Sequence, residues 1–151
     1  MPQILIDADA CPVKDEIYRV AGRHGLKVLV VANGWMRVPS SPMIERVTVT
    51  EGLDVADDWI VEHCGVGDVV VTADVPLADR CVKQGARVIG PSGKLFTPSS
   101  IGNDLAMRNL MTELRDTGEI RGTGRPFSKQ DRSRFLEALE NCIQAIKRTG
   151  R

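Results

Sequence analysis

Residues 67–89 read GDVVVTADVPLADRCVKQGARVI and contain one complete strand–helix–strand unit. The β-branched run Asp68–Thr72 predicts a buried strand, Pro76–Gln84 predicts a helix with proline in its first turn, and Arg87–Ile89 predicts a second strand. Gly85 stands where a helix commonly ends. Because strands joined by one helix run parallel, this unit predicts a parallel sheet covered by helices.

The same alternation of strand and helix extends from this unit to the N-terminus. Gln3–Ile6 and Lys27–Ala32 are apolar runs typical of buried strands, and Pro12–His24 between them has a helical pattern. Val47–Thr50 predicts a short strand, and residues 54–64 predict the helix that follows it. The expected fold class is therefore α/β, with helices on both faces of a mostly parallel sheet of about five strands.

The last third of the chain changes to a helical pattern. Ile101–Thr117 predicts an amphipathic helix, Gly118–Pro126 predicts a loop, and Ser128 predicts the start of a final helix. Together they predict a helical hairpin packed on the α/β body. The 151 residues then form one domain, residues 1–151, with the body at residues 1–100 and a helical tail at residues 101–151.

Composition and patterning exclude several classes of protein. The chain has no apolar run of about 18 residues, so no membrane-spanning segment is predicted. The N-terminus enters a strand directly, without the pattern of a secretion signal. The four cysteines form no C-x-x-C pair, which favours buried thiols over zinc ligands and disulfides. We therefore expect a cytoplasmic protein.

Acidic residues follow several of the predicted strands. Asp7 and Asp9 follow the first strand, Asp54 lies beyond the third, and Asp74 follows the fourth. The carboxyl ends of parallel strands meet at one edge of the sheet, where open α/β sheets bind their ligands. Carboxylates crowded there repel one another unless a cation joins them, and Mg²⁺ or Mn²⁺ suits oxygen ligands. The alternative for each aspartate taken singly is a helix cap or a turn.

The aspartates differ in how directly they reach this edge. Asp7 and Asp74 each end an apolar strand, whereas Asp9 also fits the cap of the following helix. The helical aspartates reach the edge only from a first turn, and the alternative for them is a solvated side chain. The predicted metal ligands are Asp7, Asp9, Asp54, Asp58, Asp74 and Asp79, and the predicted catalytic residues are Asp7, Asp58 and Asp74.

Charge is divided unevenly between the two parts of the chain. Residues 1–100 carry a formal charge of −3 and residues 101–151 carry +3, although the whole chain is neutral. The basic tail favours contact with an anionic polymer such as a nucleic-acid backbone, and the alternative is a solvated helix and loop. The residues predicted to bind nucleic acid are Arg108, Arg121, Arg125, Lys129 and Arg132.

Four stretches of the sequence resemble a known family. They are IDADACPVK at residues 6–14, DVADDWI at 54–60, TADVPLA at 72–78 and GRPFSKQDRSRF at 124–135. They resemble the YaiI/YqxD family of uncharacterised bacterial proteins, which looks like a branch of the PIN-like nuclease superfamily. The resemblance runs nearly end to end. The paired Asp7 and Asp9, the Cys11-Pro12 pair and the C-terminal hairpin are departures from general PIN-like features.

The resemblance implies a PIN-like three-layer fold and a chemistry class. PIN-like nucleases place acids around Mg²⁺ or Mn²⁺, and by resemblance Asp7, Asp74 and either Asp54 or Asp58 take those roles here. The leading hypothesis is metal-dependent phosphodiester hydrolysis, with RNA the favoured substrate.

Two other hypotheses remain open from the residues. An apolar strand followed by Asp-x-Asp is also found in aspartyl phosphatases of the haloacid dehalogenase type, with Asp7 as nucleophile and Thr72 and Lys94 in supporting roles. The third hypothesis is a non-catalytic protein that binds a metal or a nucleic acid. Cys11 is expected to be structural, because neighbouring carboxylates would raise its pKa.

Overall fold

The sheet of the protein has six strands, five of them parallel. The computed structural model describes residues 2–8, 11–50, 55–107 and 127–150. Within these residues the strand order is β3-β2-β1-β4-β5-β6, and only β6 runs antiparallel to its neighbour. The strands are β1 Gln3–Asp7, β2 Lys27–Ala32, β3 Ile44–Thr48, β4 Val69–Val71, β5 Arg87–Ile89 and β6 Leu95–Phe96.

The register of the central strands aligns the ends that carry the candidate acids. Asp7 pairs with Val31 of β2, and Ile6 pairs with Val71 of β4. Strands β1 and β4 are therefore neighbours whose carboxyl ends lie side by side. The predicted mostly parallel sheet is confirmed, with β6 as an additional strand. Its two residues, Leu95 and Phe96, are too few to show the alternation that identifies a strand in a sequence.

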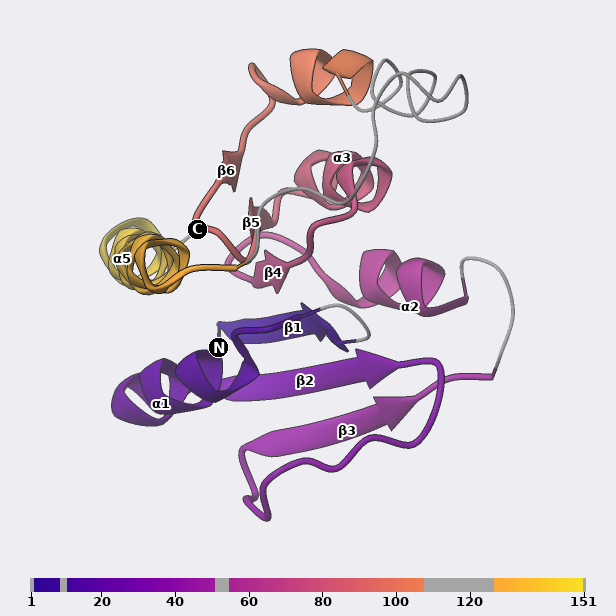
Figure 1. Cartoon of the computed structure of the whole chain (residues 1–151), viewed down its shortest axis with the longest axis vertical. Coiled ribbons are helices and arrows are strands. Elements are labelled where there is room, and N and C mark those ends of the chain that lie inside the picture. The colour runs from indigo at the N-terminus through magenta and orange to yellow at the C-terminus, as the bar shows by residue number, and fades with distance from the viewer. Residues whose placement is uncertain (1, 9–10, 51–54, 108–126, 151) are drawn as a thin grey trace.

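Helices cover both faces of the sheet, as Figure 1 shows. On one face lie α1, Lys14–His24, and α5, Lys129–Thr149. On the other lie α2, Val55–His63, and α3, Val75–Lys83, together with a helical segment at residues 101–107. The predicted three-layer α/β architecture is confirmed.

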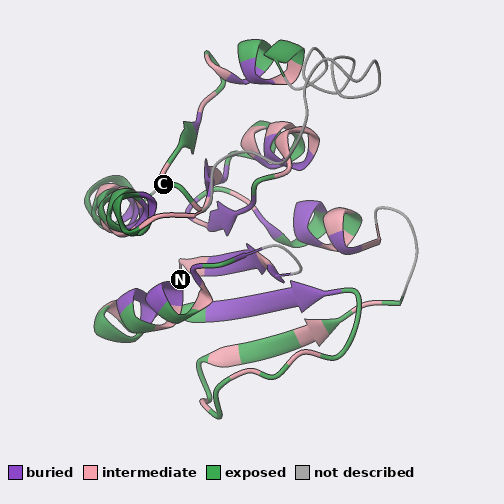
Figure 2. Ribbon diagram, viewed as in Figure 1, coloured by how far each residue is buried: buried purple, intermediate pink, exposed green. Residues whose placement is uncertain are grey.

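Alternation along the strands divides the apolar side chains between the two faces. Ile4 and Ile6 of β1 pack toward α1 and α5, whereas Leu5 between them packs toward α2 and α3. All three side chains are fully buried. Strands that are apolar on both sides require this double cover, and Figure 2 shows the middle of β1 and nearly all of β2 buried.

The two C-terminal helical segments lie on opposite faces of the sheet, where the sequence predicted a hairpin. Ile101 and Leu105 pack into the cluster with α2 and α3. Phe135 and Leu139 of α5 pack into the cluster with α1. Each face of the sheet needs an apolar cover, so each amphipathic segment is more stable on a sheet face than against the other segment.

The first turn of α5 lies at the carboxyl edge of the sheet. Arg132, near the start of α5, pairs with Glu16 near the start of α1, and Glu140 further along pairs with Arg23 near the end of α1. The two helices therefore run in the same direction, opposite to the parallel strands. A side chain at Gly93, in the loop after β5, would lie 2.7 Å from the backbone of Arg134. That close approach fixes the start of α5 against the loop.

Among the described residues, none of the helices combines the length and the apolar composition that a membrane crossing requires.

Candidate functional site

Two of the predicted acids are joined through one threonine at the carboxyl edge. The Thr72 hydroxyl donates a hydrogen bond to Oδ2 of Asp7, with 2.8 Å between the oxygens. The same hydroxyl oxygen accepts a hydrogen bond from the backbone N–H of Asp74, at 3.0 Å. Thr72 is buried, at 2 % exposure, whereas Asp7 and Asp74 are half-buried and partly accessible to solvent. The structure therefore places the carboxylate of Asp7 and the backbone of Asp74 around one hydroxyl group.

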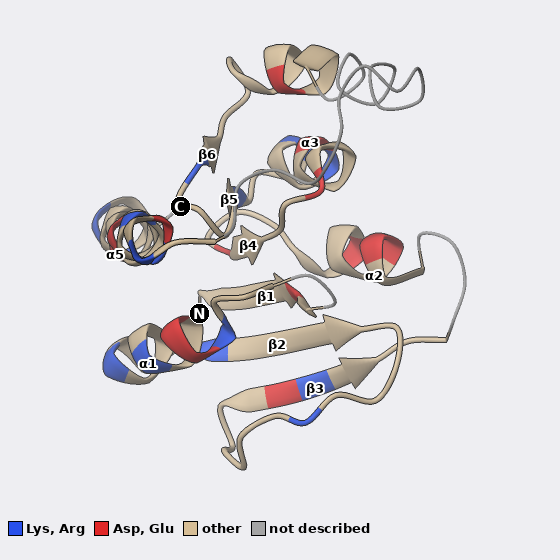
Figure 3. Cartoon of the chain, viewed as in Figure 1, with Lys and Arg blue, Asp and Glu red and all other residues tan. Residues whose placement is uncertain are grey.

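Asp74 is fixed a second time by α3. Its Oδ1 accepts a hydrogen bond from the backbone N–H of Leu77, which makes Asp74 the N-cap of the helix. The sequence predicts this behaviour, because Asp followed by Pro76 is a common helix start. Within the described residues, Oδ2 of Asp74 has no hydrogen bond, so it remains available to a ligand. In Figure 3 acidic positions mark the end of β1 and the start of α3.

The ammonium group of Lys14 contacts two backbone carbonyls close to the end of β1. The Nζ of Lys14 donates to the backbone carbonyls of Cys11, at 2.9 Å, and Ala8, at 3.3 Å. Cys11 is buried, and this burial raises the pKa of its thiol, with smaller contributions from Asp7 and Glu16. A raised pKa makes a thiol a poorer nucleophile at neutral pH, which agrees with the structural role expected of Cys11.

Two other predicted ligands lie in ion pairs on helix surfaces. Asp58 of α2 pairs with Arg80 of α3, with 2.8 Å between Oδ1 and Nη2, and both side chains are about half exposed. Asp79 pairs with Lys83 one turn along α3, at 2.9 Å. Asp58 thus contacts a cation of another helix, whereas Asp79 contacts one on the next turn of its own helix. The structure does not join them to the Asp7–Thr72–Asp74 arrangement.

Asp9 and Asp54 lie outside the described residues, as does Glu51. Across the residues that are described, no three Asp, Glu, His or Cys side chains converge in a way that could hold a metal ion. Asp7 and Asp74 thus form the part of the predicted ligand set that the structure places together. Two carboxylates are a suitable set for Mg²⁺, which keeps several waters and often takes only one or two protein carboxylates.

The predicted nucleic-acid residues are only partly described. Arg108, Arg121 and Arg125 lie outside the described residues, whereas Lys129 is exposed in the first turn of α5. Arg132 pairs with the buried carboxylate of Glu16 and lies over the ring of Phe127. The second oxygen of Glu16, Oε2, is buried without a hydrogen bond. Arg132 therefore has a structural role that the sequence alone did not reveal.

Lys94, which the phosphatase hypothesis uses, contacts a different carboxylate. Its Nζ pairs with Oδ1 of Asp104, a residue that is 8 % exposed on the helical segment at residues 101–107. The ammonium of Lys94 also lies 5.6 Å from the centre of the Phe96 ring. This pair fastens the loop after β5 to the helical segment.

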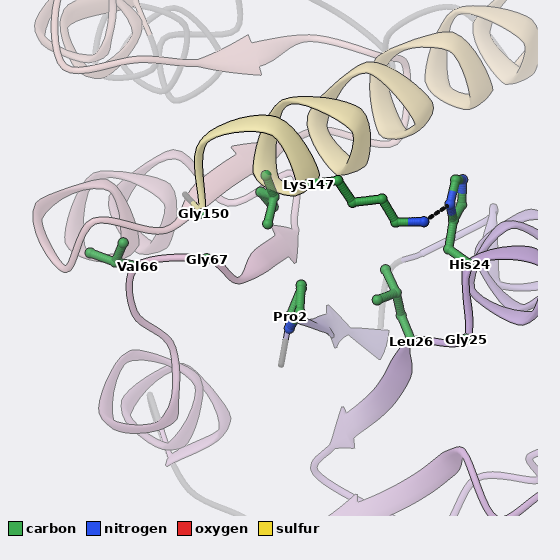
Figure 4. A pocket seen from close by; sticks show the side chains of 9 residues that line it. Pro2, His24, Gly25, Leu26, Val66, Gly67, Lys147 and Gly150 are labelled. Carbon is green, nitrogen blue, oxygen red and sulfur yellow. Dashed lines mark hydrogen bonds between the residues drawn. The ribbon is translucent and has the colours of Figure 1, made fainter.

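The opposite edge of the sheet contains a pocket of about 390 Å³ with a mainly apolar lining. Leu26, Val66 and the glycines at 25, 67 and 150 line it, as Figure 4 shows. At its rim, Nζ of Lys147 lies 2.7 Å from Nδ1 of His24, whose Nε2 lies 2.9 Å from Glu140. No aspartate lines this pocket, so the two edges differ in chemistry.

The match to a protein family covers almost the whole described body. Residues 5–145 match the family described as uncharacterised bacterial proteins of the YaiI/YqxD type. The chain belongs to the YaiI/YqxD family. The match includes Asp7, Thr72 and Asp74, and it extends through most of α5.

Relatives of this family are similar over their full length. A "UPF0178 protein" of Rhodopseudomonas palustris strain BisB18 is 59 % identical over 149 residues, which cover 99 % of this chain and 96 % of the relative. A "UPF0178 protein" of Nitrobacter winogradskyi is 60 % identical over 146 residues, covering 97 % of this chain and 93 % of the relative. No solved structure matches the chain.

Proposed function

We propose that this protein is a nuclease that depends on Mg²⁺ or Mn²⁺ and hydrolyses phosphodiester bonds in RNA. The observation that carries the proposal is the hydrogen-bonded arrangement of Asp7, Thr72 and Asp74 at the carboxyl edge of the sheet. Open α/β sheets bind their ligands at this edge, and two carboxylates there favour a divalent cation. A place in the PIN-like nuclease superfamily is part of the proposal.

The residues of the chain would act by holding their oxygens in fixed positions. Thr72 orients Asp7 through its hydroxyl proton, and α3 orients Asp74 through the backbone N–H of Leu77. A bound cation would lower the pKa of a water molecule and neutralise charge on the phosphate. Asp7 and Asp74 would hold the cation, and the water and the substrate phosphate would bind beside it.

The surroundings of the pair suit an anionic substrate in a reducing compartment. Lys14 lies beside the chain that follows Asp7, and the exposed Lys129 begins α5 at the same edge. Such cations attract a phosphate backbone. The four cysteines are all free and buried, which fits the cytoplasm as the location that we propose.

The test is cleavage of a fluorescent single-stranded RNA with Mg²⁺ or Mn²⁺ by Asp74→Asn. Asparagine caps a helix about as well as aspartate, so the fold is retained while a charged ligand is lost. We expect the rate to fall by about 100-fold or more. A rate equal to that of the unmodified protein would contradict the proposal, as would a lack of RNA and DNA cleavage with both metals.

Asp58→Asn is the matched control. This substitution removes an aspartate of another family-like stretch, residues 54–60, whose carboxylate pairs with Arg80. Exposed ion pairs contribute at most about 1 kcal/mol, so we expect both stability and cleavage close to the unmodified protein. Equal losses in Asp58→Asn and Asp74→Asn would instead place Asp58 in the metal site.

One observation favours a second candidate function, an aspartyl phosphatase. The hydroxyl of Thr72 beside Asp7 is the contact expected of a strand-end hydroxyl near a nucleophilic aspartate. In that reaction the Asp7 carboxylate would attack phosphorus, the P–O ester bond would break, and Asp9, the second acid of Asp-x-Asp, would donate a proton to the leaving alkoxide. Mass spectrometry of the protein after incubation with a phosphomonoester decides this: a phosphate on Asp7 supports the phosphatase, and its absence during turnover excludes it.

A further inference from the structure

The segment after β2 lies beside the edge strand β3 and presents two exposed side chains, Trp35 and Arg37. Met36 and Val38 pack against the core on the α1 side, whereas Trp35 and Arg37 between and beside them are exposed. This alternation indicates extended backbone, in which residues two apart share a side. Trp35 and Arg37 are therefore displayed together on one side of this segment, beside β3.

Trp35 is an exposed aromatic surface supported by a cation. It is 71 % exposed, the most of any large apolar side chain in the described part of the chain. The guanidinium carbon of Arg46, from β3, lies 5.0 Å from the centre of its ring, and Arg46 also donates to the backbone carbonyl of Met36. Because the Arg46 guanidinium covers one face of the indole, the solvent-exposed surface of Trp35 is its other face and its edges.

A pocket of about 420 Å³ adjoins this segment and combines cations with hydroxyl groups. Lys14 and Arg37 line it with the hydroxyl-bearing Tyr18 and Ser40, and Asp15 supplies one opposing carboxylate. Burial and the charge of Asp15 raise the pKa of Tyr18, so its hydroxyl remains a donor at neutral pH. Two cations and two hydroxyls against one carboxylate suit a single phosphate.

Lys14 connects this pocket to the candidate catalytic residues. A lysine ammonium has three N–H donors, and Lys14 uses two of them on the carbonyls of Ala8 and Cys11. The third donor is available to an anion in the pocket. Ala8 directly follows Asp7 in the sequence. A nucleic-acid strand whose phosphate binds Lys14 can therefore continue toward the Asp7–Thr72–Asp74 arrangement.

We propose that these groups, which we call the Trp35 platform, bind single-stranded nucleic acid. The Trp35 platform consists of Trp35, Arg46, Arg37 and Lys14: one base stacks on the indole, and the adjacent phosphate contacts Arg37 and Lys14. A base stacks on an aromatic side chain only when its own face is open, so single strands are bound in preference to duplexes. The inference rests on the proposed nuclease function, for which it supplies the path of the substrate strand.

The test measures binding of a short, fluorescently labelled 2′-O-methyl oligouridylate in EDTA. Two signals report the binding: tryptophan fluorescence of the protein and anisotropy of the label on the oligonucleotide. Stacking should quench the fluorescence of Trp35, and Trp35→Ala should weaken binding about tenfold, since a stacked base contributes strongly to affinity. Trp35→Phe keeps an aromatic face and should recover part of the loss. Arg37→Ala should reduce the slope of log affinity against log salt by about 0.7, the value for one phosphate contact on a single strand.

Two control variants keep the comparison specific. Trp59→Phe alters the other tryptophan, which stacks on His63 with 3.8 Å between ring centres, and should leave the affinity unchanged. Arg23→Ala removes an exposed arginine at the opposite end of α1 and should leave the salt dependence unchanged. Unchanged affinity in Trp35→Ala, equal binding of a duplex of the same length, or absence of any binding would each overturn the proposal.

The measurement separates this proposal from the nuclease proposal, because it uses neither metal nor cleavage. Weaker binding in Trp35→Ala without cleavage by the unmodified protein would retain the Trp35 platform and reject the nuclease. Cleavage that requires Asp74 with full binding by Trp35→Ala would retain the nuclease and reject the Trp35 platform.

Discussion

The two edges of the sheet use the same helices and strands for different purposes. At the carboxyl edge, polar groups of β1, β4 and the following turns converge on Thr72. At the amino edge, the end of α5 closes over Leu26 and Val66 and leaves a mainly apolar pocket. One edge holds carboxylates that an ion or substrate can reach, and the other joins the helices to the sheet. The difference teaches that aspartates gather at the carboxyl edge because the parallel strands end there, and that the pocket at the amino edge lacks such a group among its described lining residues.

The largest expected effect contrasts one variant from each edge. Asp7→Asn removes a charged ligand while it keeps an oxygen that Thr72 can contact, and it should lower RNA cleavage about 100-fold or more. Lys147→Ala at the amino edge removes a contact to His24 and should leave cleavage unchanged. Initial rates on the same single-stranded RNA check both. Equal losses in the two variants would remove the functional distinction between the edges.

The contrast also extends to backbone packing, through a glycine at each edge. At Gly93, φ is +93° and an added methyl carbon would lie 2.7 Å from the backbone of Arg134. We expect Gly93→Ala to lower the free energy of unfolding by about 3 kcal/mol, from an unfavourable φ and a backbone clash. At Gly25, φ is +67° with nothing near, so Gly25→Ala should cost about 1 kcal/mol. Urea denaturation measures both, and a larger cost at Gly25 would contradict the packing described at Gly93.

A smaller effect tests what Arg132 does at the carboxyl edge. Arg132→Ala leaves the buried Glu16 carboxylate without its cation, so the free energy of unfolding should fall by about 2 kcal/mol. Lys129→Ala, three residues earlier on the exposed surface, is the control and should change stability by less than about 0.5 kcal/mol. Thermal denaturation compares them. Reduced RNA affinity in Arg132→Ala without loss of stability would show that nucleic-acid contact is its main role.

The smallest effect concerns pH at the amino edge. The hydrogen bond from His24, followed by that from Gln144, lowers the pKa of Glu140. A lowered pKa in the folded state stabilises the protein above the unfolded pKa, and this stabilisation is lost as the pH falls through the folded value. Glu140→Gln should therefore cost about 0.5 kcal/mol at about pH 6 and progressively less as the solution is acidified below about pH 4. A cost that grows on acidification would show the opposite sign.

The fold was largely predictable because periodicity carries most of the signal. The apolar run Lys27–Ala32 and the alternating unit at residues 67–89 identify buried parallel strands without any tertiary information. The placement of the C-terminal helices was not predictable in the same way. An amphipathic pattern shows that a helix has a partner, but the choice of sheet face depends on which face the other helices leave open.

The candidate site was predictable only where the backbone dictates it. Strand ends place Asp7 and Asp74 at one edge, and the sequence reveals this directly. For the other predicted site residues that the structure describes, the side-chain partner decides the role: Arg80 binds Asp58, Lys83 binds Asp79, and Glu16 binds Arg132. Such pairs join different elements or depend on rotamers, so spacing does not reveal them. The outward placement of Trp35 had no signal in the sequence either, since residues 35–38 read Trp-Met-Arg-Val, and only the structure shows that exposed and half-buried side chains alternate there.

The docking of α5 has a consequence for how the protein forms during synthesis. Phe135, Leu139, Ile143 and Ile146 of α5 cover the same sheet face as α1, yet they come late in the chain. Until the ribosome has released them, Val69, Val71 and Ile89 face solvent on that side, which is a state prone to aggregation. A nascent chain halted before α5 should therefore engage chaperones, and the Asp7–Thr72–Asp74 arrangement should become rigid only after α5 has left the ribosome.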